Sequence, residues 1–166
     1  MDTVQQTLAL QIGVPNLYDS PNTIAIRKII TDEFGGAATK DHLNCTEYVQ
    51  YRVKTKLGIT IEWPADRPRN GGEWAAIFKK HNMYTVLASP VLHAAMCFTA
   101  GISTNAAVNA IGHVAFVEEV LPDGSVKISE ANWPPLGQQP QGQYNERVIS
   151  KQRWQEHYRA QFVCFV

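Results

Sequence analysis

Residues 44–58, NCTEYVQYRVKTKLG, predict a helix that begins with a thiol. Asn44 is suited to cap this helix, Glu47 follows three positions later as in a capping box, and Gly58 is placed to end it. The thiol and the apolar positions share one helix face: Cys45, Tyr48, Val49, Val53 and Leu57. Because a helix N-terminus carries unsatisfied N–H groups and a partial positive charge, Cys45 occupies a position that favours the thiolate, the nucleophilic form of cysteine.

A partner for this thiol stands at the start of a predicted strand, residues 114–120. His113 directly precedes this strand and is our candidate general base. A catalytic histidine also needs a third group that orients its ring, and Glu130 and Asn132 share one face of the following predicted strand, residues 126–132. Whether that face also carries His113 depends on the strand register, because a slip by one residue turns both side chains away.

The remaining cysteines and histidines predict no further chemistry. Cys97 and Cys164 lie within apolar strands, where a free cysteine is usually a small buried hydrophobe. An odd number of cysteines without a C-x-x-C spacing predicts neither a disulfide framework nor a zinc knuckle. His42 precedes Cys45 closely, but no further ligands follow at a metal-binding spacing. We therefore predict no metal and no organic cofactor.

The order of the predicted elements defines the fold class. Helices are predicted over residues 20–34, 45–57 and 73–80, strands over 84–87, 94–98, 114–120, 126–132, 144–149 and 161–166, and loops over 63–72, 101–111 and 134–143. The third and fourth strands form a hairpin around Pro122-Asp123-Gly124-Ser125. Helices followed by antiparallel strands predict an α+β fold.

The composition fits one globular domain and argues against two classes of binding protein. The chain has 166 residues, of which 45% are hydrophobic, so it can bury a core without disulfides. Its 15 Lys and Arg balance 15 Asp and Glu, and this zero net charge argues against general binding to nucleic acid or to an anionic membrane. No run has transmembrane length, and the first residues lack the basic and apolar regions of a signal peptide. We expect the protein to be made in the cytoplasm without a signal peptide.

Five segments, in uninterrupted order, resemble the motifs of the CHAP family, the cysteine- and histidine-dependent amidohydrolases/peptidases with a papain-like fold. The segments are residues 44–52, NCTEYVQYR; 72–75, GEWA; 84–98, YTVLASPVLHAAMCF; 112–118, GHVAFVE; and 123–133, DGSVKISEANW. Tyr144 and Arg147 stand where the family often has a further Tyr and Arg. The resemblance implies a catalytic domain over residues 38–166 and leaves residues 1–37 as an N-terminal arm and helix.

The resemblance also implies a role for each candidate site residue. Cys45 would be the nucleophile, His113 the general base and Glu130 the group that orients His113, with Asn132 as a further polar residue of the active site. Three residues that border these motifs are the predicted substrate contacts: Asn44, Trp74 and Trp133. Since an amide at position 130 could still orient the ring, the sequence predicts that Glu130→Gln is milder than the loss of Cys45 or His113.

The function implied by the resemblance is thiol-dependent hydrolysis of bacterial peptidoglycan, by an amidase or endopeptidase. Without a signal peptide, such an enzyme would act at the cell wall when released or injected, as a phage endolysin or an interbacterial toxin effector does. Its partners would be a peptidoglycan peptide or amide substrate and a delivery apparatus or inhibitor protein, with no nucleic acid and no membrane. Two alternatives stay open: a cytosolic hydrolase of a small amide such as a glutathione–polyamine conjugate, and a catalytically silent peptide-binding or structural module.

Overall fold

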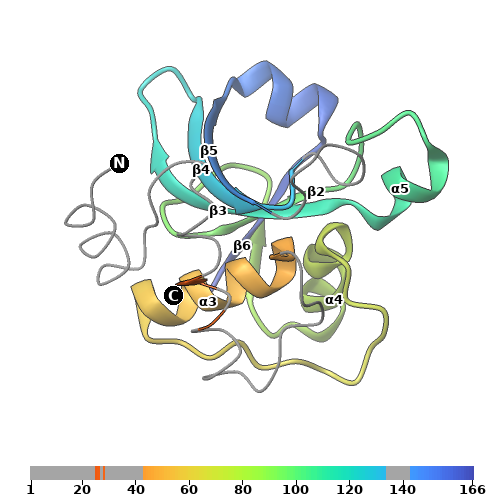
Figure 1. Ribbon diagram of the computed structural model, residues 1–166, viewed down its shortest axis with the longest axis vertical. Helices are drawn as coiled ribbons and strands as arrows, with labels where there is room; N and C mark the ends of the chain where they lie inside the picture. Colours follow the sequence, from red (N-terminus) through yellow and green to blue (C-terminus); the bar gives the residue numbers. More distant parts are fainter. Residues whose placement is uncertain (1–24, 27, 29–42, 134–142) are drawn as a thin grey trace.

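The computed structural model describes residues 25, 26, 28, 43–133 and 143–166 (Figure 1). Most of the predicted N-terminal arm and helix, and the predicted loop after residue 133, lie outside these residues. Ile26, on the predicted first helix, is fully buried in the core. The division of the chain at residue 37 stays a prediction.

A six-stranded antiparallel sheet forms the centre of the fold, in the order β1-β6-β2-β3-β4-β5. The strands are β1 Thr85–Leu87, β2 Ala95–Phe98, β3 His113–Val120, β4 Val126–Ala131, β5 Tyr144–Ile149 and β6 Gln161–Cys164. The bounds agree with the predicted strands to within two residues, because alternating apolar residues and the Asp-Gly turn mark both edges of the central hairpin. The predicted α+β fold with an antiparallel sheet is confirmed.

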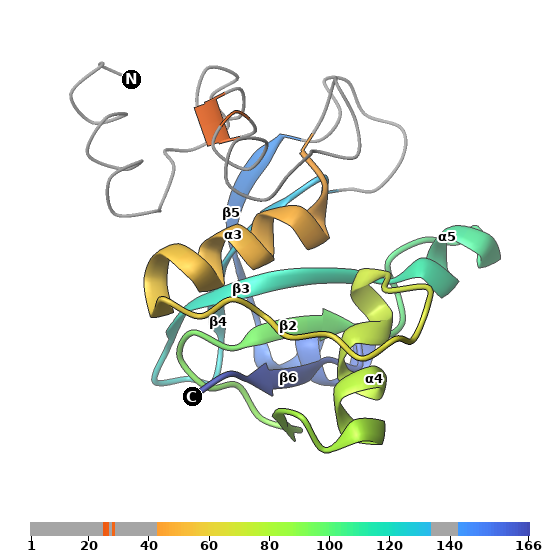
Figure 2. The ribbon, with the colours of Figure 1, turned by 90° about the horizontal axis from the view of Figure 1, so that it is seen from below.

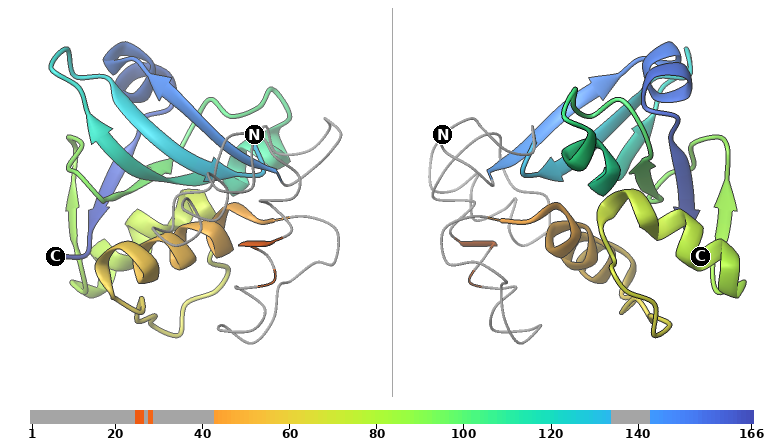
Figure 3. Two further views of the ribbon diagram at one scale, coloured as in Figure 1. Left: turned by 60° about the vertical axis from the view of Figure 1, so that its left-hand side comes forward. Right: turned by 90° about the vertical axis from the view of Figure 1, so that its right-hand side faces the viewer.

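Helices cover both faces of this sheet, as Figures 1 and 3 show. The helical segments are α3 Cys45–Leu57, η1 Gly71–Glu73, α4 Trp74–His81, α5 Ala106–Ile111 and η2 Arg153–His157. One core cluster lies between the sheet and α3 and α4, and a second lies on the opposite face, where Trp154 and Tyr158 pack. Within the described residues, every helix is too short or too polar to span a membrane.

The predicted loop over residues 101–111 is wrong in its second half, where Ala106–Ile111 form α5. Asn105 caps this helix, because its side-chain oxygen accepts hydrogen bonds from the N–H groups of Ala107 and Val108 at 3.0 and 3.3 Å. An Asn cap followed by alanines is enough to begin a short helix. The η2 segment has no counterpart among the predicted elements.

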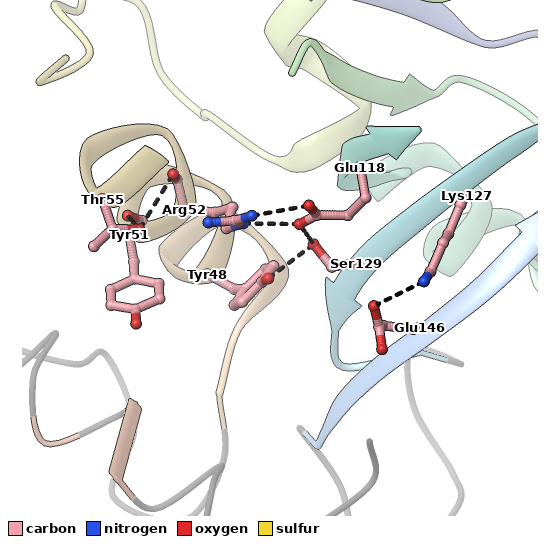
Figure 4. A network of polar contacts seen from close by, with 8 residues as sticks. All are labelled: Tyr48, Tyr51, Arg52, Thr55, Glu118, Lys127, Ser129 and Glu146. Carbon is pink, nitrogen blue, oxygen red and sulfur yellow. Dashed lines mark hydrogen bonds and ion pairs between the residues drawn. The ribbon is translucent and has the colours of Figure 1, made fainter. Parts of the chain in front are cut away.

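A polar network connects α3 to the β3–β4 hairpin (Figure 4). Arg52 donates two hydrogen bonds to the Glu118 carboxylate, from Nε at 2.7 Å and from Nη2 at 2.9 Å. The Tyr48 hydroxyl donates to Ser129 Oγ at 2.8 Å, and Ser129 Oγ donates to Glu118 Oε1 at 2.8 Å. We call these four residues the helix-anchoring network. The Arg52 side chain is only 1% exposed, so its charge depends on Glu118 for compensation.

The helix-anchoring network also sets the direction of α3 along the sheet. Tyr48 bonds Ser129, which pairs with Phe116 in the sheet, while Arg52 bonds Glu118, two residues further along β3. The helix and the strand therefore run side by side in the same direction, as Figure 2 shows. The first residues of α3 and β3 come to lie at the same end of the sheet.

The buried ion pair gives a prediction about stability. Replacing Arg52 by Met leaves the Glu118 carboxylate without its cation, so we expect the free energy of unfolding to fall by about 3 kcal/mol. The pair of Lys127 and Glu146 provides the control, because its charged atoms are 3.8 Å apart and the Lys127 side chain is 44% exposed. Lys127→Met should therefore cost less than about 1 kcal/mol. Urea denaturation of both variants measures these values. Equal losses would contradict the structural role given to Arg52.

Candidate active site

Cys45, His113 and Glu130 form a continuous chain of polar contacts. Cys45 is the first residue of α3 and is half-buried. Its side chain hydrogen-bonds to His113, and His113 Nε2 lies 2.8 Å from Glu130 Oε1. Because Nε2 is engaged by Glu130, Nδ1 is the ring nitrogen left for the thiol. The structure thus brings together three of the four predicted catalytic residues, contributed by α3, β3 and β4.

The strand register places His113 and Glu130 on the same face of the sheet. Phe116 pairs with Ser129 and Val117 with Ile128. Side chains alternate between the faces along each strand, so His113 points to the same face as Val117, and Glu130 to the same face as Ile128. The register that the sequence left open is therefore the one in which Glu130, on β4, can contact the imidazole.

Glu130 is completely buried and accepts hydrogen bonds from three side chains. His113 contacts Oε1, Asn145 Nδ2 donates to Oε2 at 2.7 Å, and Arg147 donates from Nε to Oε2 at 2.7 Å and from Nη2 to Oε1 at 3.3 Å. We call Asn145 and Arg147, both on β5, the carboxylate clamp. Every partner of Glu130 is a hydrogen-bond donor once His113 is protonated, so both oxygens are used as acceptors.

The contacts shift the pKa of His113 and of Glu130 in opposite directions. Burial alone would lower the pKa of His113, but hydrogen bonds and charge interactions with Cys45 and Glu130 outweigh burial and raise it to about 9. Burial would raise the pKa of Glu130, but the hydrogen bond from His113 and the charges of His113 and Arg147 hold it below its ordinary value. Both shifts favour an imidazolium beside a carboxylate at neutral pH.

Two glycines allow the backbone before His113 to pack against η1. A Cβ atom on Gly72 would lie 2.7 Å from the Cα of Gly112, and one on Gly112 would lie 2.4 Å from the Cα of Gly72. Gly112 also has a φ of 68°, which side chains disfavour. The close backbone contact between η1 and residue 112 fixes where β3 begins, and so where the His113 ring lies.

Cys97 and Cys164 are outside this constellation, as predicted. Cys97 is fully buried in β2, and burial raises the pKa of its thiol to about 12. Burial also raises the pKa of Cys164 on β6. Neither thiol has the environment of a nucleophile.

The predicted substrate contacts have different environments. Asn44 occupies the N-cap position, but its side chain makes no capping hydrogen bond; instead its Nδ2 donates to Glu47 Oε1 at 2.7 Å. The predicted capping box is therefore wrong in its hydrogen bonding. Trp74 is fully buried in the core, so its ring has no surface to offer a substrate. Trp133 is half-buried, with its ring centroid 4.9 Å from that of His113, and it remains a candidate contact.

Asn132 follows β4 in a left-handed conformation with a φ of 61°. Its backbone N–H donates to the carbonyl of Gln143 at 3.1 Å. Glu130, rather than Asn132, is the residue that bonds His113 Nε2. A role for the Asn132 side chain in the site stays a prediction.

Sequence reasoning noted Arg147 as a family position but gave neither Arg147 nor Asn145 a role in the site. Asn145 and Arg147 alternate along one strand, which was the available signal, but their contact with Glu130 depends on the pairing of β4 with β5. That pairing places Glu130 opposite Asn145 and Ile128 opposite Arg147. Within the described residues, no three His, Cys, Asp or Glu side chains are grouped so that they could hold a metal ion.

Comparisons with known proteins identify the family. A family model described as the CHAP domain matches residues 35–132. An N-acetylmuramoyl-L-alanine amidase domain-containing protein of Staphylococcus aureus is 40% identical over 96 residues, which are 58% of this chain and 14% of that protein. A staphylococcal secretory antigen of the same species is 39% identical over 89 residues, which are 54% of this chain and 27% of that protein.

A solved structure agrees with these sequence relatives. The crystal structure of an N-acetylmuramoyl-L-alanine amidase from Staphylococcus aureus matches with a TM-score of 0.55 and 34% sequence identity, covering 74% of this chain and 30% of that chain. The chain spans less than a third of the length of each of these three relatives. Because the family model covers more than half of the chain and contains Cys45, His113 and Glu130, this chain belongs to the CHAP domain family.

Proposed function

We propose that this protein is a peptidoglycan hydrolase that cleaves an amide or peptide bond with a Cys45–His113–Glu130 mechanism. The observation that carries the proposal is the chain of contacts from the half-buried Cys45 through His113 to the buried Glu130. A thiol at a helix start and an oriented imidazole beside it are the functional groups that nucleophilic acyl transfer requires. A binding or structural module would have no need of this arrangement.

In the first step, the Cys45 thiolate attacks the carbonyl carbon of the scissile bond. The new carbon–sulfur bond forms as the carbonyl electron pair moves to oxygen, and the Cys45 backbone N–H at the helix start is positioned to donate to that oxyanion. The carbon–nitrogen bond then breaks, and the His113 imidazolium gives its Nδ1 proton to the leaving amine. The products of this step are a free amine and a thioester on Cys45.

In the second step, water releases the acyl group. Neutral His113 takes a proton from the water as it attacks the thioester carbon, and the carbon–sulfur bond breaks to regenerate the thiolate and the imidazolium. Glu130 holds the ring through Nε2 and compensates the imidazolium charge in both steps. Asn132 is proposed as a further polar contact in the site.

The proposed substrate follows from the relatives. Two of the similar proteins are named as N-acetylmuramoyl-L-alanine amidases or as containing their domain, and these names point to an amide bond in the bacterial cell wall. The third is named as a secretory antigen, which supports action outside the cytoplasm. We therefore place the proposed activity at the bacterial cell wall.

Digestion of purified sacculi tests this function directly. The purified protein should release soluble fragments whose masses identify the bond that is cleaved. Cys45→Ala and His113→Ala should each abolish release, and to a similar degree, because members of one catalytic unit do not contribute additively. Cys164→Ala is the matched control and should keep wild-type activity. Release that survives Cys45→Ala would contradict the mechanism, and turnover of a glutathione–polyamine conjugate without any release from sacculi would contradict the substrate.

The environment of Glu130 changes the expectation for Glu130→Gln. A glutamine has one acceptor oxygen and one NH2 group, so at least one donor among His113, Asn145 and Arg147 would face another donor. We therefore expect kcat to fall at least about a hundredfold, nearly as far as in His113→Ala. Steady-state kinetics on a soluble muropeptide measures this loss. A variant with most of its activity would show that the carboxylate is not needed as a double acceptor.

The raised pKa of His113 predicts the alkaline limit of the enzyme. Above about pH 9, His113 loses the proton that the leaving amine requires, so kcat should be level near neutral pH and fall through this value. Its ordinary pKa is about 6.5. The stability contributed by the charged ring should therefore be complete below about pH 6.5 and be lost as the pH rises through about 9.

Nuclear magnetic resonance of the His113 ring measures the pKa directly. Cys45→Ala is the comparison, because loss of the thiol contact should lower the pKa of His113. An alkaline limb of kcat that does not coincide with the titration of His113 would remove this residue from the acid role.

A further inference from the structure

Arg147 contacts two residues that themselves contact His113. Its guanidinium donates to both oxygens of Glu130, at 2.7 and 3.3 Å. The same guanidinium lies over the Trp133 ring, with its central carbon 4.1 Å from the ring centroid. Glu130 bonds the imidazole, and the Trp133 ring packs at 4.9 Å from it. Arg147 therefore supports His113 from two directions without contacting the thiol.

Arg147 is held in turn by the fold. It lies on β5, opposite Ile128 of β4, and its side chain is 23% exposed. Its Nη1 is 3.4 Å from the Tyr158 hydroxyl, which accepts a further hydrogen bond from Arg153 at 3.1 Å. A guanidinium that is hydrogen-bonded through Nε, Nη1 and Nη2 and packed against the Trp133 ring has little freedom to rotate.

The charges around Glu130 come from the strands on each side of it. The imidazolium of His113 faces it from β3, and the guanidinium of Arg147 faces it from β5, together with the neutral amide of Asn145. The thiol of Cys45 lies beyond the ring of His113. Because a buried carboxylate between two cations stays ionised, removal of either cation should make ionisation of Glu130 harder.

We propose that Arg147 is a positioning residue of the catalytic site, which fixes the Glu130 carboxylate and the Trp133 ring and thereby holds His113 in the geometry and charge state needed for catalysis. The inference rests on the proposed function for its catalytic consequence, but its structural consequence can be measured without any substrate. Arg147 is not a catalytic residue, since it acts through Glu130 and Trp133.

The first test is Arg147→Met, with the side-chain carboxyl carbon of Glu130 followed by nuclear magnetic resonance during a pH titration. The variant removes the cation and both hydrogen bonds that hold the pKa of Glu130 down, so this pKa should rise. In steady-state kinetics, kcat should fall by about tenfold to a hundredfold. In the pH profile of kcat, the acid limb should shift to higher pH together with the pKa of Glu130. An unchanged pKa of Glu130 in the folded variant would overturn the proposal.

The second test separates the charge of Arg147 from its shape. Arg147→Lys keeps a cation but loses the fork and the planar contact with Trp133. The pKa of Glu130 should stay low in this variant while kcat falls about tenfold and KM changes less. If Arg147→Met does not fold, Arg147→Lys decides alone: wild-type kcat in the folded lysine variant overturns the positioning role.

Arg153→Met is the matched control. Arg153 shares the Tyr158 hydroxyl with Arg147 but is exposed on η2, so its loss should change neither the pKa of Glu130 nor kcat. A control variant that lowers kcat as much as Arg147→Lys would attribute the effect to Tyr158 and overturn the proposal. If wild-type protein cleaves no peptidoglycan, the proposed function fails, whereas the titration of Glu130 in Arg147→Met still decides whether Arg147 controls the carboxylate.

Discussion

The ion pair between Arg52 and Glu118 is the interaction on which the position of the thiol depends. Apolar packing holds α3 against the sheet but is not directional, so by itself it would tolerate small shifts of the helix along β3. A buried guanidinium that donates two hydrogen bonds to one carboxylate tolerates very little displacement. Since Cys45 lies two helical turns before Arg52 on the same rigid helix, fixing Arg52 beside Glu118 also fixes the thiol beside the first residue of β3.

The central hairpin carries a second polar network on its other face, and β4 joins the two. Ser129 points toward α3 and belongs to the helix-anchoring network, whereas its neighbour Glu130 points to the opposite face and bonds His113. Successive residues of one strand therefore position the helix that carries Cys45 and the ring that faces it. A site built on paired central strands holds its geometry more closely than one built on loops, and the burial of Glu130 makes any loosening of its contacts costly.

Features that depend on residues near in the sequence were predictable, whereas features that depend on distant residues were not. The α3 helix and the strands were predictable because caps, turns and alternation are local signals, and Cys45, His113 and Glu130 were predictable as a set from their motifs. The α5 helix was missed because its signal is one capping residue, Asn105. The burial of Trp74 and the three donors around Glu130 were not predictable in this way. Both depend on which distant side chains surround a residue, and for Glu130 these come from strand pairing that the sequence does not specify.

The pairing of β4 with β5 is consequently as important to the site as the motifs themselves. The family model ends at residue 132, before either member of the carboxylate clamp. In the observed register, Asn145 and Arg147 share the face of Glu130, while Glu146 pairs with Ser129 on the face toward α3. A slip of one residue would exchange these faces. It would turn the guanidinium away and bring the carboxylate of Glu146 toward that of Glu130, where two like charges in a buried site oppose ionisation. One of the two carboxylates would then have to take up a proton, and the charge that balances the imidazolium would be less well fixed. The electrostatics that keep His113 charged therefore require this register, which the segment matched by the family model does not itself determine.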